Sequence, residues 1–402
     1  MTTDKVLSGK RVLIGVCGGI AAYKIPDLIS RLTKLGAEVK VVMTKAATEF
    51  VAPLTFQSMS HNPVACDMFA EPVAWEIRHI ALAQWADVLL IAPATANMIG
   101  KLACGIADDM LSTVAMAVRA PVLVAPAMNT AMYENAATQA NLSVLRERGI
   151  GLIAPGEGRL ACGDTGRGKL AEVEALLDAV VCTAAFPKDL AGKKVLVTAG
   201  ATMEAVDPVR YLTNHSTGKM GIEIARAARW RGAEVTLVAG SIAAAPPLGV
   251  ELIRVKSARE MFDVCTRLQK DMDVIIKAAA VADFRPAQTA EHKIKKDGAA
   301  GIIQLEQNPD ILEYLGKHKA DGQILVGFCM ETENLIENAK RKLAKKNLDL
   351  IAANSLLEPG AGFAADTNTV TLLYGDGGRE ALPNMSKFSV AQHLLDKVKS
   401  WL

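Results

Sequence analysis

Two stretches of the chain, RVLIGVCGG at residues 11–19 and KKVLVTAG at residues 193–200, decide the fold. Each is a near-continuous apolar run that ends in small residues, a pattern typical of a strand buried on both faces of a parallel sheet. Each is followed by a segment of helical period that ends in Gly-Ala-Glu-Val, at 36–39 and 232–235. The chain therefore contains the same strand–helix–strand opening twice.

Further apolar runs with helical segments between them continue both halves. The runs cover 39–44, 87–94, 121–128, 273–280, 324–328, 349–354 and 369–374, and helices are expected at 25–36, 172–182, 222–231 and 387–402. We predict an α/β protein of two doubly wound, Rossmann-like domains. The 402 residues fit two domains of ordinary size, and the segment AAFPKD places the join between residues 1–186 and residues 187–402.

Composition excludes several classes of protein. Lys and Arg total 45 against 43 for Asp and Glu, so neither nucleic acid nor an anionic membrane is expected as a partner. No apolar run reaches the roughly 18 residues of a membrane helix, and the start does not resemble a secretory signal. Seven cysteines without a Cys-x-x-Cys pair argue against a structural zinc site and for a reducing compartment. A cytoplasmic protein is expected.

The turn after the first strand carries Gly18 and Gly19, which can bring backbone amides close to a phosphate or simply form a tight turn. The spacing is not G-x-G-x-x-G, and the second strand ends in Thr44 rather than in an acidic residue, which favours a mononucleotide over NAD. Two other strand ends carry PATAN (93–97) and PAMN (126–129), whose polar groups can edge a flat ring system.

The glycine-rich stretch GRLACGDTGRGKL (158–170) contains Cys162. A lone cysteine is usually a small core residue, but the glycines and basic residues around this one favour a reactive thiol. Considered alone, His79 is interpreted as a structural residue rather than a functional one.

Taken together, GGIAAYK, His79 with Ile80, PATANMIGK, PAMNTAMYENAA and GRLACGDTGRG resemble the flavin-dependent decarboxylases of 4′-phosphopantothenoylcysteine, over residues 8–180. The resemblance implies a flavodoxin-like domain in which FMN oxidises the thiol carbon of the substrate and so creates an electron sink for the loss of CO₂. It implies that His79 is the base, Asn129 clamps the substrate carboxylate and Cys162 donates a proton. The residues implied for FMN are Gly18, Gly19, Thr44, Thr95, Asn97 and Met128.

The second half has 13 more residues between its first two strands than the first half, and they fall in the polar stretch 201–221. This insertion follows a strand at the edge where open α/β sheets bind ligands, so a functional loop is expected there. Its end, NHSTGKMG (214–221), precedes a helix and fits an anion site or an ordinary capped helix equally well. Asp283, the lysines of 293–296 and NPDI (308–311) follow later strands and favour a triphosphate.

The segments TAGATMEAVDPVRYLTNHSTGKMG, KAAAVADFRP, KIKK, NPDIL, VGF and KKNLDLIAAN resemble phosphopantothenate–cysteine ligase, over about 190–400. The resemblance implies CTP with Mg²⁺, and an acyl-cytidylate that Asn214 and Lys293 help to form and consume. His292 and Phe284 depart from the expected pattern at positions that should carry no chemistry. The residues implied for CTP are Lys277, Ala278, Ala279, Asp283, Lys293, Pro309, Asp310, Ile311, Leu312, Phe328, Lys342 and Lys346, whereas no metal ligands are indicated.

The order of the two halves is that of the fused bacterial bifunctional enzymes of coenzyme A biosynthesis, whose substrates are 4′-phosphopantothenate, cysteine and CTP. By the same resemblance we expect a homo-oligomer built from trimers, up to a dodecamer, with dimeric ligase halves. The alternatives are an NAD(P)-dependent oxidoreductase and a non-catalytic flavin-binding regulatory protein. Intact Asn129, Cys162, Asn214 and Lys293 argue against the regulatory protein.

Overall fold

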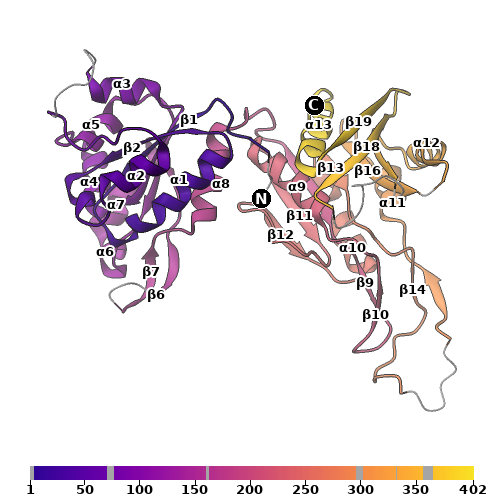
Figure 1. Cartoon of the computed structure of the whole chain (residues 1–402). Coiled ribbons are helices and arrows are strands. Elements are labelled where there is room, and N and C mark those ends of the chain that lie inside the picture. Colours follow the sequence, from indigo (N-terminus) through magenta and orange to yellow (C-terminus); the bar gives the residue numbers. More distant parts are fainter. Residues whose placement is uncertain (1–3, 70–76, 160–162, 296–301, 332, 356–364) are drawn as a thin grey trace. The chain divides into compact units, whose positions relative to one another are not determined.

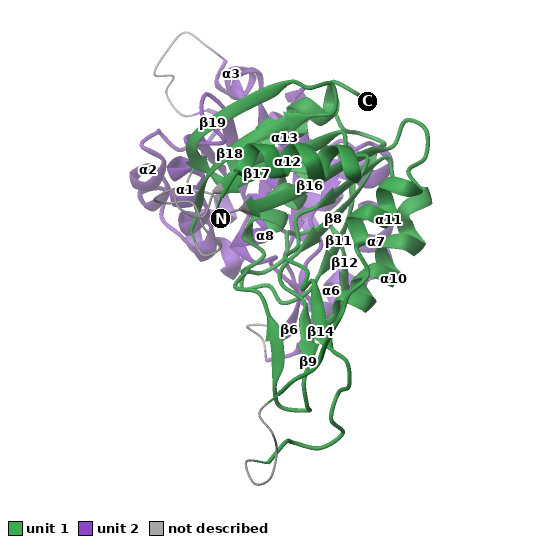
Figure 2. Cartoon of the chain, turned by 90° about the vertical axis from the view of Figure 1, so that its right-hand side faces the viewer, with its two compact units in different colours: residues 1–4, 187–402 green, residues 5–186 purple. Residues whose placement is uncertain are grey.

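The structure is a computed structural model that describes residues 4–69, 77–159, 163–295, 302–331, 333–355 and 365–402. The chain forms two compact units, residues 5–186 (the N-terminal unit) and residues 1–4 with 187–402 (the C-terminal unit), coloured separately in Figure 2. Among the described residues, no helix has the length and apolar character needed to cross a membrane.

The N-terminal unit is built on a parallel sheet with the strand order β2-β1-β3-β4-β5, which is that of the flavodoxin-like fold. Strand β1 is buried along almost its whole length because both faces of the sheet are covered. A hairpin of β6 and β7 follows the sheet. The strands are β1 (Arg11–Val16), β2 (Glu38–Met43), β3 (Val88–Ala94), β4 (Val122–Pro126), β5 (Gly151–Leu152), β6 (Gly156–Arg159) and β7 (Thr165–Lys169).

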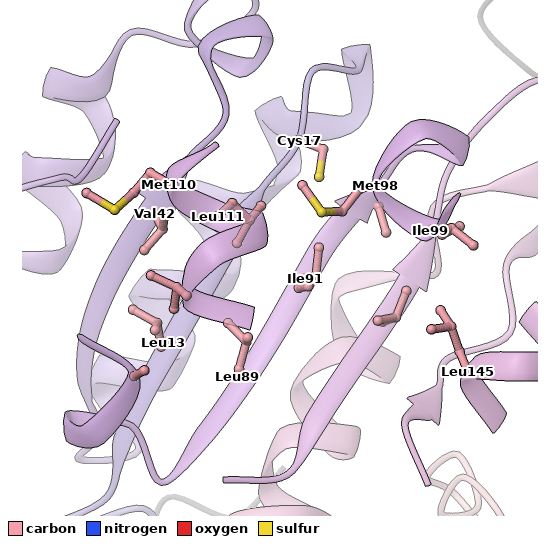
Figure 3. Packing of buried hydrophobic residues seen from close by; sticks show 14 of the residues in the cluster. Leu13, Cys17, Val42, Leu89, Ile91, Met98, Ile99, Met110, Leu111 and Leu145 are labelled. Atoms are coloured by element: carbon pink, nitrogen blue, oxygen red, sulfur yellow. The ribbon is translucent and has the colours of Figure 1, made fainter. Parts of the chain in front are cut away.

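Helices cover both faces of this sheet, as Figure 1 shows. Helices α1 and α8 pack together on one face. Strand residues such as Leu13, Leu89 and Ile91 join residues of α3, α4, α5 and α7 in a continuous apolar core on the other face (Figure 3). The helices are α1 (Ile25–Lys34), α2 (Pro53–Ser60), α3 (Arg78–Trp85), α4 (Ala96–Cys104), α5 (Met110–Ala117), α6 (Thr130–Glu134), α7 (Ala136–Glu147) and α8 (Val173–Ala184), with 3₁₀ turns η1 (Ile20–Lys24) and η2 (Lys45–Glu49).

The C-terminal unit contains a larger sheet with the order β12-β11-β8-β13-β16-β17-β18-β19. The first six strands are parallel in the doubly wound order 3-2-1-4-5-6, and β18 and β19 add an antiparallel edge. The strands are β8 (Lys194–Ala199), β11 (Glu234–Ala239), β12 (Glu251–Arg254), β13 (Val274–Lys277), β16 (Ile324–Glu331), β17 (Leu350–Ser355), β18 (Thr367–Tyr374) and β19 (Arg379–Ser386).

Helices α9 and α13 pack together, with the rings of Trp230 and Phe388 in an edge contact at 5.3 Å. Apolar residues of α10, α11 and α12 pack against alternate residues of the strands in a second core. The two-domain, doubly wound fold class that the sequence predicts is therefore confirmed. The helices are α9 (Lys219–Trp230), α10 (Ala258–Leu268), α11 (Ile311–Lys317), α12 (Leu335–Lys345) and α13 (Lys387–Lys399), with a 3₁₀ turn η3 (Gln269–Asp271).

The inserted stretch of the second half differs from the expected loop, because it contains an antiparallel hairpin of β9 (Met203–Ala205) and β10 (Tyr211–Thr213). A second small pair, β14 (Phe284–Pro286) and β15 (Leu305–Gln307), lies beside it. Figures 1 and 2 show these elements extending beyond one end of the large sheet. We call residues 202–213 and 284–307, as far as they are described, the arm.

Candidate active sites

The N-terminal unit has a cavity of about 610 Å³ at the carboxyl ends of β1, β3 and β4. The strand order reverses between β1 and β3, and this switch point is where open α/β sheets bind ligands. The lining combines apolar side chains with lysine and arginine. It consists of Gly18, Gly19, Ile20, Ala21, Tyr23, Lys24, Thr95, Ala96, Ala127, Met128, Asn129, Met132, Arg159, Gly168, Lys169 and Leu170.

Two of the glycines in the wall stand where a side chain would not fit. A Cβ on Gly18 would lie 2.5 Å from the Cβ of Ala46, the second residue after Thr44. Gly168 has φ +131°, and a Cβ there would lie 2.3 Å from the carbonyl oxygen of Met128. The space beside Gly19 is open, so a ligand can approach the backbone there.

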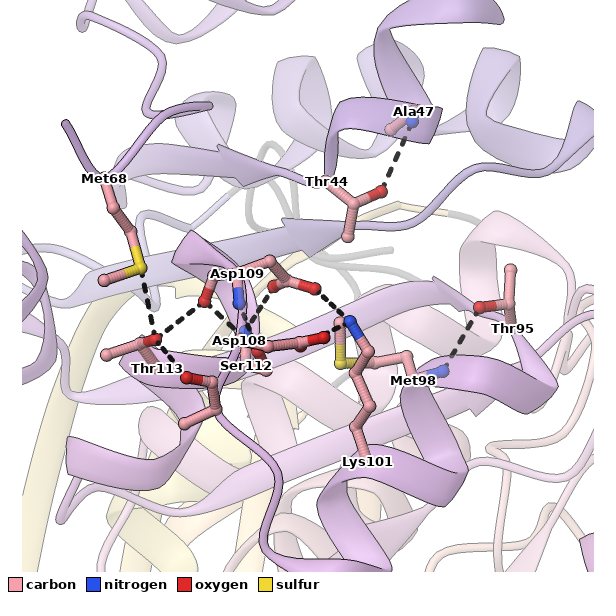
Figure 4. Close-up of polar contacts among 11 residues, drawn as sticks. Thr44, Ala47, Met68, Thr95, Met98, Lys101, Asp108, Asp109, Ser112 and Thr113 are labelled. Carbon is pink, nitrogen blue, oxygen red and sulfur yellow. Dashed lines mark hydrogen bonds and ion pairs between the residues drawn. The ribbon is translucent and has the colours of Figure 1, made fainter. Parts of the chain in front are cut away.

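Polar groups at the strand ends are ordered by helix caps. The Thr95 hydroxyl accepts a hydrogen bond from Met98 N–H at the start of α4, and the Thr44 hydroxyl accepts one from Ala47 N–H (Figure 4). Lys101 forms ion pairs of 2.6 Å with both Asp108 and Asp109, between α4 and α5. These contacts hold the loops of the carboxyl edge in place.

Asn129 is held at the cavity wall by contacts that include two hydrogen bonds. Its Oδ1 accepts a hydrogen bond from Ala131 N–H at 2.8 Å, which caps α6, and its Nδ2 donates one to Asp164 at 2.8 Å.

Cys17 lies just after the end of β1 and is buried. Burial raises the pKa of its thiol to about 12, so Cys17 is not a reactive thiolate.

The cavity brings together five of the residues predicted for this half, namely Gly18, Gly19, Thr95, Met128 and Asn129. Thr44, Asn97 and His79 do not line it; His79 lies in the first turn of α3 and is half-buried. Cys162 lies outside the described residues. Sequence reasoning did not single out Tyr23, Lys24 or Met132, although they belong to the segments GGIAAYK and PAMNTAMYENAA that carry the resemblance.

The C-terminal unit has a cavity of about 270 Å³ beside its own switch point between β8 and β13. Four lysines reach it from different elements, namely Lys219 of α9, Lys277 of β13, Lys342 of α12 and Lys387 of α13. The remaining lining residues are Asn214, Ser216, Gly218, Met220, Gly221, Ala278, Ala279, Ala280, Val281, Phe328, Cys329, Met330, Asn354 and Asn368. Such a concentration of cations suits a polyanionic ligand.

Close approach of α9 to β8 explains the glycines at this cavity. A Cβ on Gly221 would lie 2.6 Å from the Cβ of Ala199, and one on Gly218, at φ +77°, would lie 3.1 Å from the backbone nitrogen of Gly200. The start of α9 is thus brought against the end of the first strand, and its first residues line the cavity.

Two of the four lysines have strongly lowered pKa values. Burial, together with the charge of Lys346, lowers the pKa of Lys277 to about 8, against an opposing effect of Asp310 and Asp283. Burial and the charge of Lys219 lower the pKa of Lys387 to about 8. Only 4% of Lys387 is exposed, so its ammonium is held inside the unit.

The cavity contains Asn214, Lys277, Ala278, Ala279, Phe328 and Lys342 of the residues predicted for the ligase half. Asp310 caps α11 and pairs with Lys346 at 2.7 Å, and both act on the charge of Lys277 without lining the cavity. Ile311 and Leu312 are core residues. Asp283, Lys293 and Pro309 do not line the cavity, and Lys293 is exposed in the arm.

Sequence reasoning missed Lys387 and Asn368, because nothing in the local pattern of α13 or β18 distinguishes them from ordinary residues at a helix start or in a strand.

Within the described part of the chain, no group of three or more His, Cys, Asp or Glu side chains is arranged to hold a metal ion.

Two family models match the chain. Residues 2–185 match the flavoprotein family, and residues 190–402 match the C-terminal domain of DNA/pantothenate metabolism flavoproteins. A relative from Bacillus subtilis (strain 168), named coenzyme A biosynthesis bifunctional protein CoaBC, is 47% identical over 398 residues, which is 98% of this chain and 97% of the relative. The chain belongs to the CoaBC family.

A CoaBC relative from Vibrio vulnificus (strain YJ016) is 45% identical over 98% of this chain and 99% of the relative. The solved C-terminal domain of a CoaBC protein has 41% identity, covers 53% of this chain and 97% of that domain, and gives a TM-score of 0.46. The family that the sequence motifs indicated is thus confirmed over both halves, and the N-terminal unit is a flavoprotein domain.

Proposed function

We propose that this CoaBC family member catalyses two consecutive steps of coenzyme A biosynthesis in the cytoplasm. The C-terminal unit would join cysteine to 4′-phosphopantothenate with CTP and Mg²⁺, and the N-terminal unit would decarboxylate the product with FMN. The observation that carries the proposal is the pair of contrasting cavities, each at the carboxyl edge of its own sheet. One is roomy, largely apolar and lined by glycine, and the other is small and lined by four lysines.

The N-terminal cavity fits FMN by the chemistry of its walls. The open backbone at Gly19 suits a phosphate, while Met128 and Leu170 offer apolar surface to a flat ring. When bound, FMN would supply the two-electron oxidation and reduction that decarboxylation of a cysteine carboxylate requires. Lys24 and Lys169, both paired with Glu172, add positive charge at the cavity rim.

The residues of the chain would position the substrate in this cavity. Asn129 presents an amide whose orientation is set by Ala131 and Asp164, so it suits a substrate carboxylate that must be held while it leaves as CO₂. We assign His79 as the base and Cys162 as the proton donor of the closing step. We propose that Thr44 and Asn97 support the cofactor from the neighbouring strand ends.

In the C-terminal cavity, the phosphopantothenate carboxylate would attack the α-phosphorus of CTP and expel pyrophosphate. The cysteine amine would then attack the mixed anhydride and release cytidylate. Lys277 and Lys342 would neutralise charge that builds up on the phosphates, and Lys293 would join them from the arm. Asn214, whose Nδ2 donates to Ala280 O at 3.2 Å, would hold the acyl-cytidylate at the cavity. Mg²⁺ would accompany the CTP phosphates, as is usual for this ion.

The remaining nucleotide residues would act from around this cavity. We propose Phe328 and the backbone of Ala278 and Ala279 as direct contacts, since they line it. Asp283, Lys346 and the segment 309–312 would complete the CTP site from its margin.

Exposed apolar side chains support an oligomer. Beside the N-terminal cavity, Tyr23 is 63% exposed and Ile20 and Met132 are also exposed. We propose that trimer formation covers this surface and that a partner copy brings His79 to the cavity. In the arm, Tyr211 is 54% exposed and Leu305 is also exposed, and we propose that ligase halves pair through the arm, up to a dodecamer.

The test is product analysis by mass spectrometry. Purified protein incubated with 4′-phosphopantothenate, cysteine, CTP and Mg²⁺ should yield 4′-phosphopantetheine, cytidylate, pyrophosphate and CO₂. Replacing CTP by ATP tests the choice of nucleotide, and light scattering before and after Tyr23→Asp or Tyr211→Asp tests the assembly. Cytidylate release without phosphopantetheine would contradict the decarboxylase assignment, and absence of pyrophosphate would contradict the ligase assignment.

A further inference from the structure

A fully buried carboxylate lies in the turn between β9 and β10 of the arm. This is Asp207, whose side chain has no exposed surface. Its Oδ1 accepts hydrogen bonds from the backbone N–H groups of Val209 and Arg210, both at 2.8 Å. Its Oδ2 accepts one from the N–H of Ile294 at 3.2 Å, 87 residues further along the chain. One side chain therefore closes the hairpin turn and also binds the segment that carries Lys293.

Residues 289–294, which we call the Lys293 segment, lie beside the β9–β10 hairpin and form hydrogen bonds with it at both ends. The Thr289 hydroxyl donates to Ala205 O at 3.1 Å, and Ala290 N–H donates to Val206 O at 3.0 Å. At the C-terminal end of the segment, Asp207 accepts the hydrogen bond from Ile294 N–H. The Arg210 guanidinium adds a bond of 2.8 Å to the carbonyl of Ile294, so that both backbone groups of Ile294 are held.

The same hairpin leads to the ligase cavity. Strand β10 ends at Thr213, whose hydroxyl donates to Thr202 O at 2.7 Å, and the next residue is Asn214 at the cavity wall. The turn at Asp207 thus joins two segments that each carry a residue of the proposed ligase reaction. Without this junction, residues 289–294 would have fewer bonds to the hairpin that leads to the cavity.

We infer that Asp207 is a positioning residue of the ligase reaction, which sets the backbone from which Lys293 reaches the nucleotide. The inference rests on the proposed function, in which Lys293 neutralises the phosphates. The Lys293 side chain is long and exposed, so the accuracy with which it delivers its charge depends on how firmly its backbone is held. A carboxylate that accepts several N–H bonds is a firm anchor, because charge-assisted bonds are about twice as strong as neutral ones.

The charged form of Asp207 is the one that the fold favours. Burial by itself raises the pKa of this carboxyl, but the N–H groups of Val209, Ile294 and Arg210 lower it below its usual range. Asp207→Asn keeps the size of the side chain but removes the charge and replaces one acceptor by an NH₂ group, which leaves a backbone N–H without its partner.

A double-mutant cycle tests the inference on the full-length protein. The rate of pyrophosphate release from CTP, phosphopantothenate and Mg²⁺ is measured for wild type, Asp207→Asn, Lys293→Gln and the double variant. In the wild-type background Asp207→Asn should slow release by roughly 10- to 100-fold, the effect of losing a charge-assisted hydrogen bond. In the Lys293→Gln background it should slow release by no more than about 3-fold, because the lysine that it positions is gone.

Two controls separate positioning from general loosening of the arm. Glu306→Gln breaks the 2.6 Å pair with Arg285 in the same arm and should leave pyrophosphate release unchanged. Asp207→Glu keeps the charge and should retain more activity than Asp207→Asn; if Asp207→Asn does not fold, Asp207→Glu replaces it in the cycle. Decarboxylation of phosphopantothenoylcysteine should be normal in every variant, because that reaction belongs to the N-terminal unit, and circular dichroism with thermal unfolding checks that the C-terminal unit is folded.

The outcomes are distinguishable. Equal fold-losses in both backgrounds, or no loss in the wild-type background, would overturn the role of Asp207 while leaving the proposed nucleotide site in place. Normal pyrophosphate release by Lys293→Gln alone would overturn the nucleotide role of Lys293 in the proposed function, and the inference with it.

Discussion

Replacing Lys277 by methionine should stabilise the C-terminal unit and at the same time disable its ligase activity. Lys277 ends β13 at the cavity, where burial holds its pKa at about 8 against an ordinary value of 10.5. The charged ammonium is thus less favourable in the folded protein than in the unfolded chain. Methionine has a similar length without the charge, so it removes this cost while still filling the space.

The size of the effect follows from the difference between the pKa of Lys277 in the folded protein and in the unfolded chain. A tenfold change in proton affinity corresponds to about 1.4 kcal/mol, so the lowering of the pKa from 10.5 to about 8 makes the cost of keeping Lys277 charged in the fold at most about 3.5 kcal/mol. It is an upper limit because the side chain is only half-buried and opens on the cavity. The cost is fully present below pH 8, declines as the pH rises through the folded pKa, and has nearly vanished by pH 10.5, where the unfolded chain also loses the proton.

Calorimetry of the full-length protein measures this effect, with the unfolding of the N-terminal unit identified by release of its flavin. At pH 7 the other transition should rise by up to roughly 7–14 °C in Lys277→Met, and the gain should shrink toward pH 10. Lys345→Met, on the exposed side of α12, is the matched control and should change little. The value of kcat/KM for CTP should fall roughly 30- to 1000-fold. An unchanged or lowered transition at pH 7, or a gain that persists at pH 10.5, would refute the reasoning.

Four further outcomes are expected. A fragment of residues 1–188 should fold and bind FMN, seen as a yellow protein that releases FMN on denaturation; a folded, colourless fragment would contradict the flavin site. Cys162→Ala should release CO₂ from phosphopantothenoylcysteine but form little phosphopantetheine, by gas and product assays, whereas normal turnover would make the thiol structural. Lys293→Gln should suppress pyrophosphate release, whereas Asn214→Asp should release pyrophosphate and accumulate acyl-cytidylate; loss of the same step in both would show that the roles are not divided. Wild-type ligation should decline above about pH 8, because the two low-pKa lysines of the cavity lose their charge there; a rate that stays flat to pH 10 in a pH profile would argue against both.

The fold class, and one edge of each sheet as the place for chemistry, could be predicted from the amino-acid pattern alone. Apolar runs such as 11–16 and 194–199 are buried on both faces, so their pattern is local and can be read directly. Parallel strands end at a common edge, and the residues after each strand therefore meet. This is why Gly18, Thr95 and Met128, which follow three different strands, were predicted together and do line one cavity.

Which charges share a site depends on how distant segments pack together, and no local pattern indicates it. Lys387 begins the last long helix, and it joins Lys219 in the ligase cavity because α13 packs along α9. Asp207 meets Ile294 only because two segments 87 residues apart run side by side in the arm. Conversely, Ile311 and Leu312 of the predicted nucleotide segment turn into the core. A local pattern shows which side chains favour burial, but side-by-side placement of distant segments is set by packing, and packing also decides which buried amines have their pKa lowered.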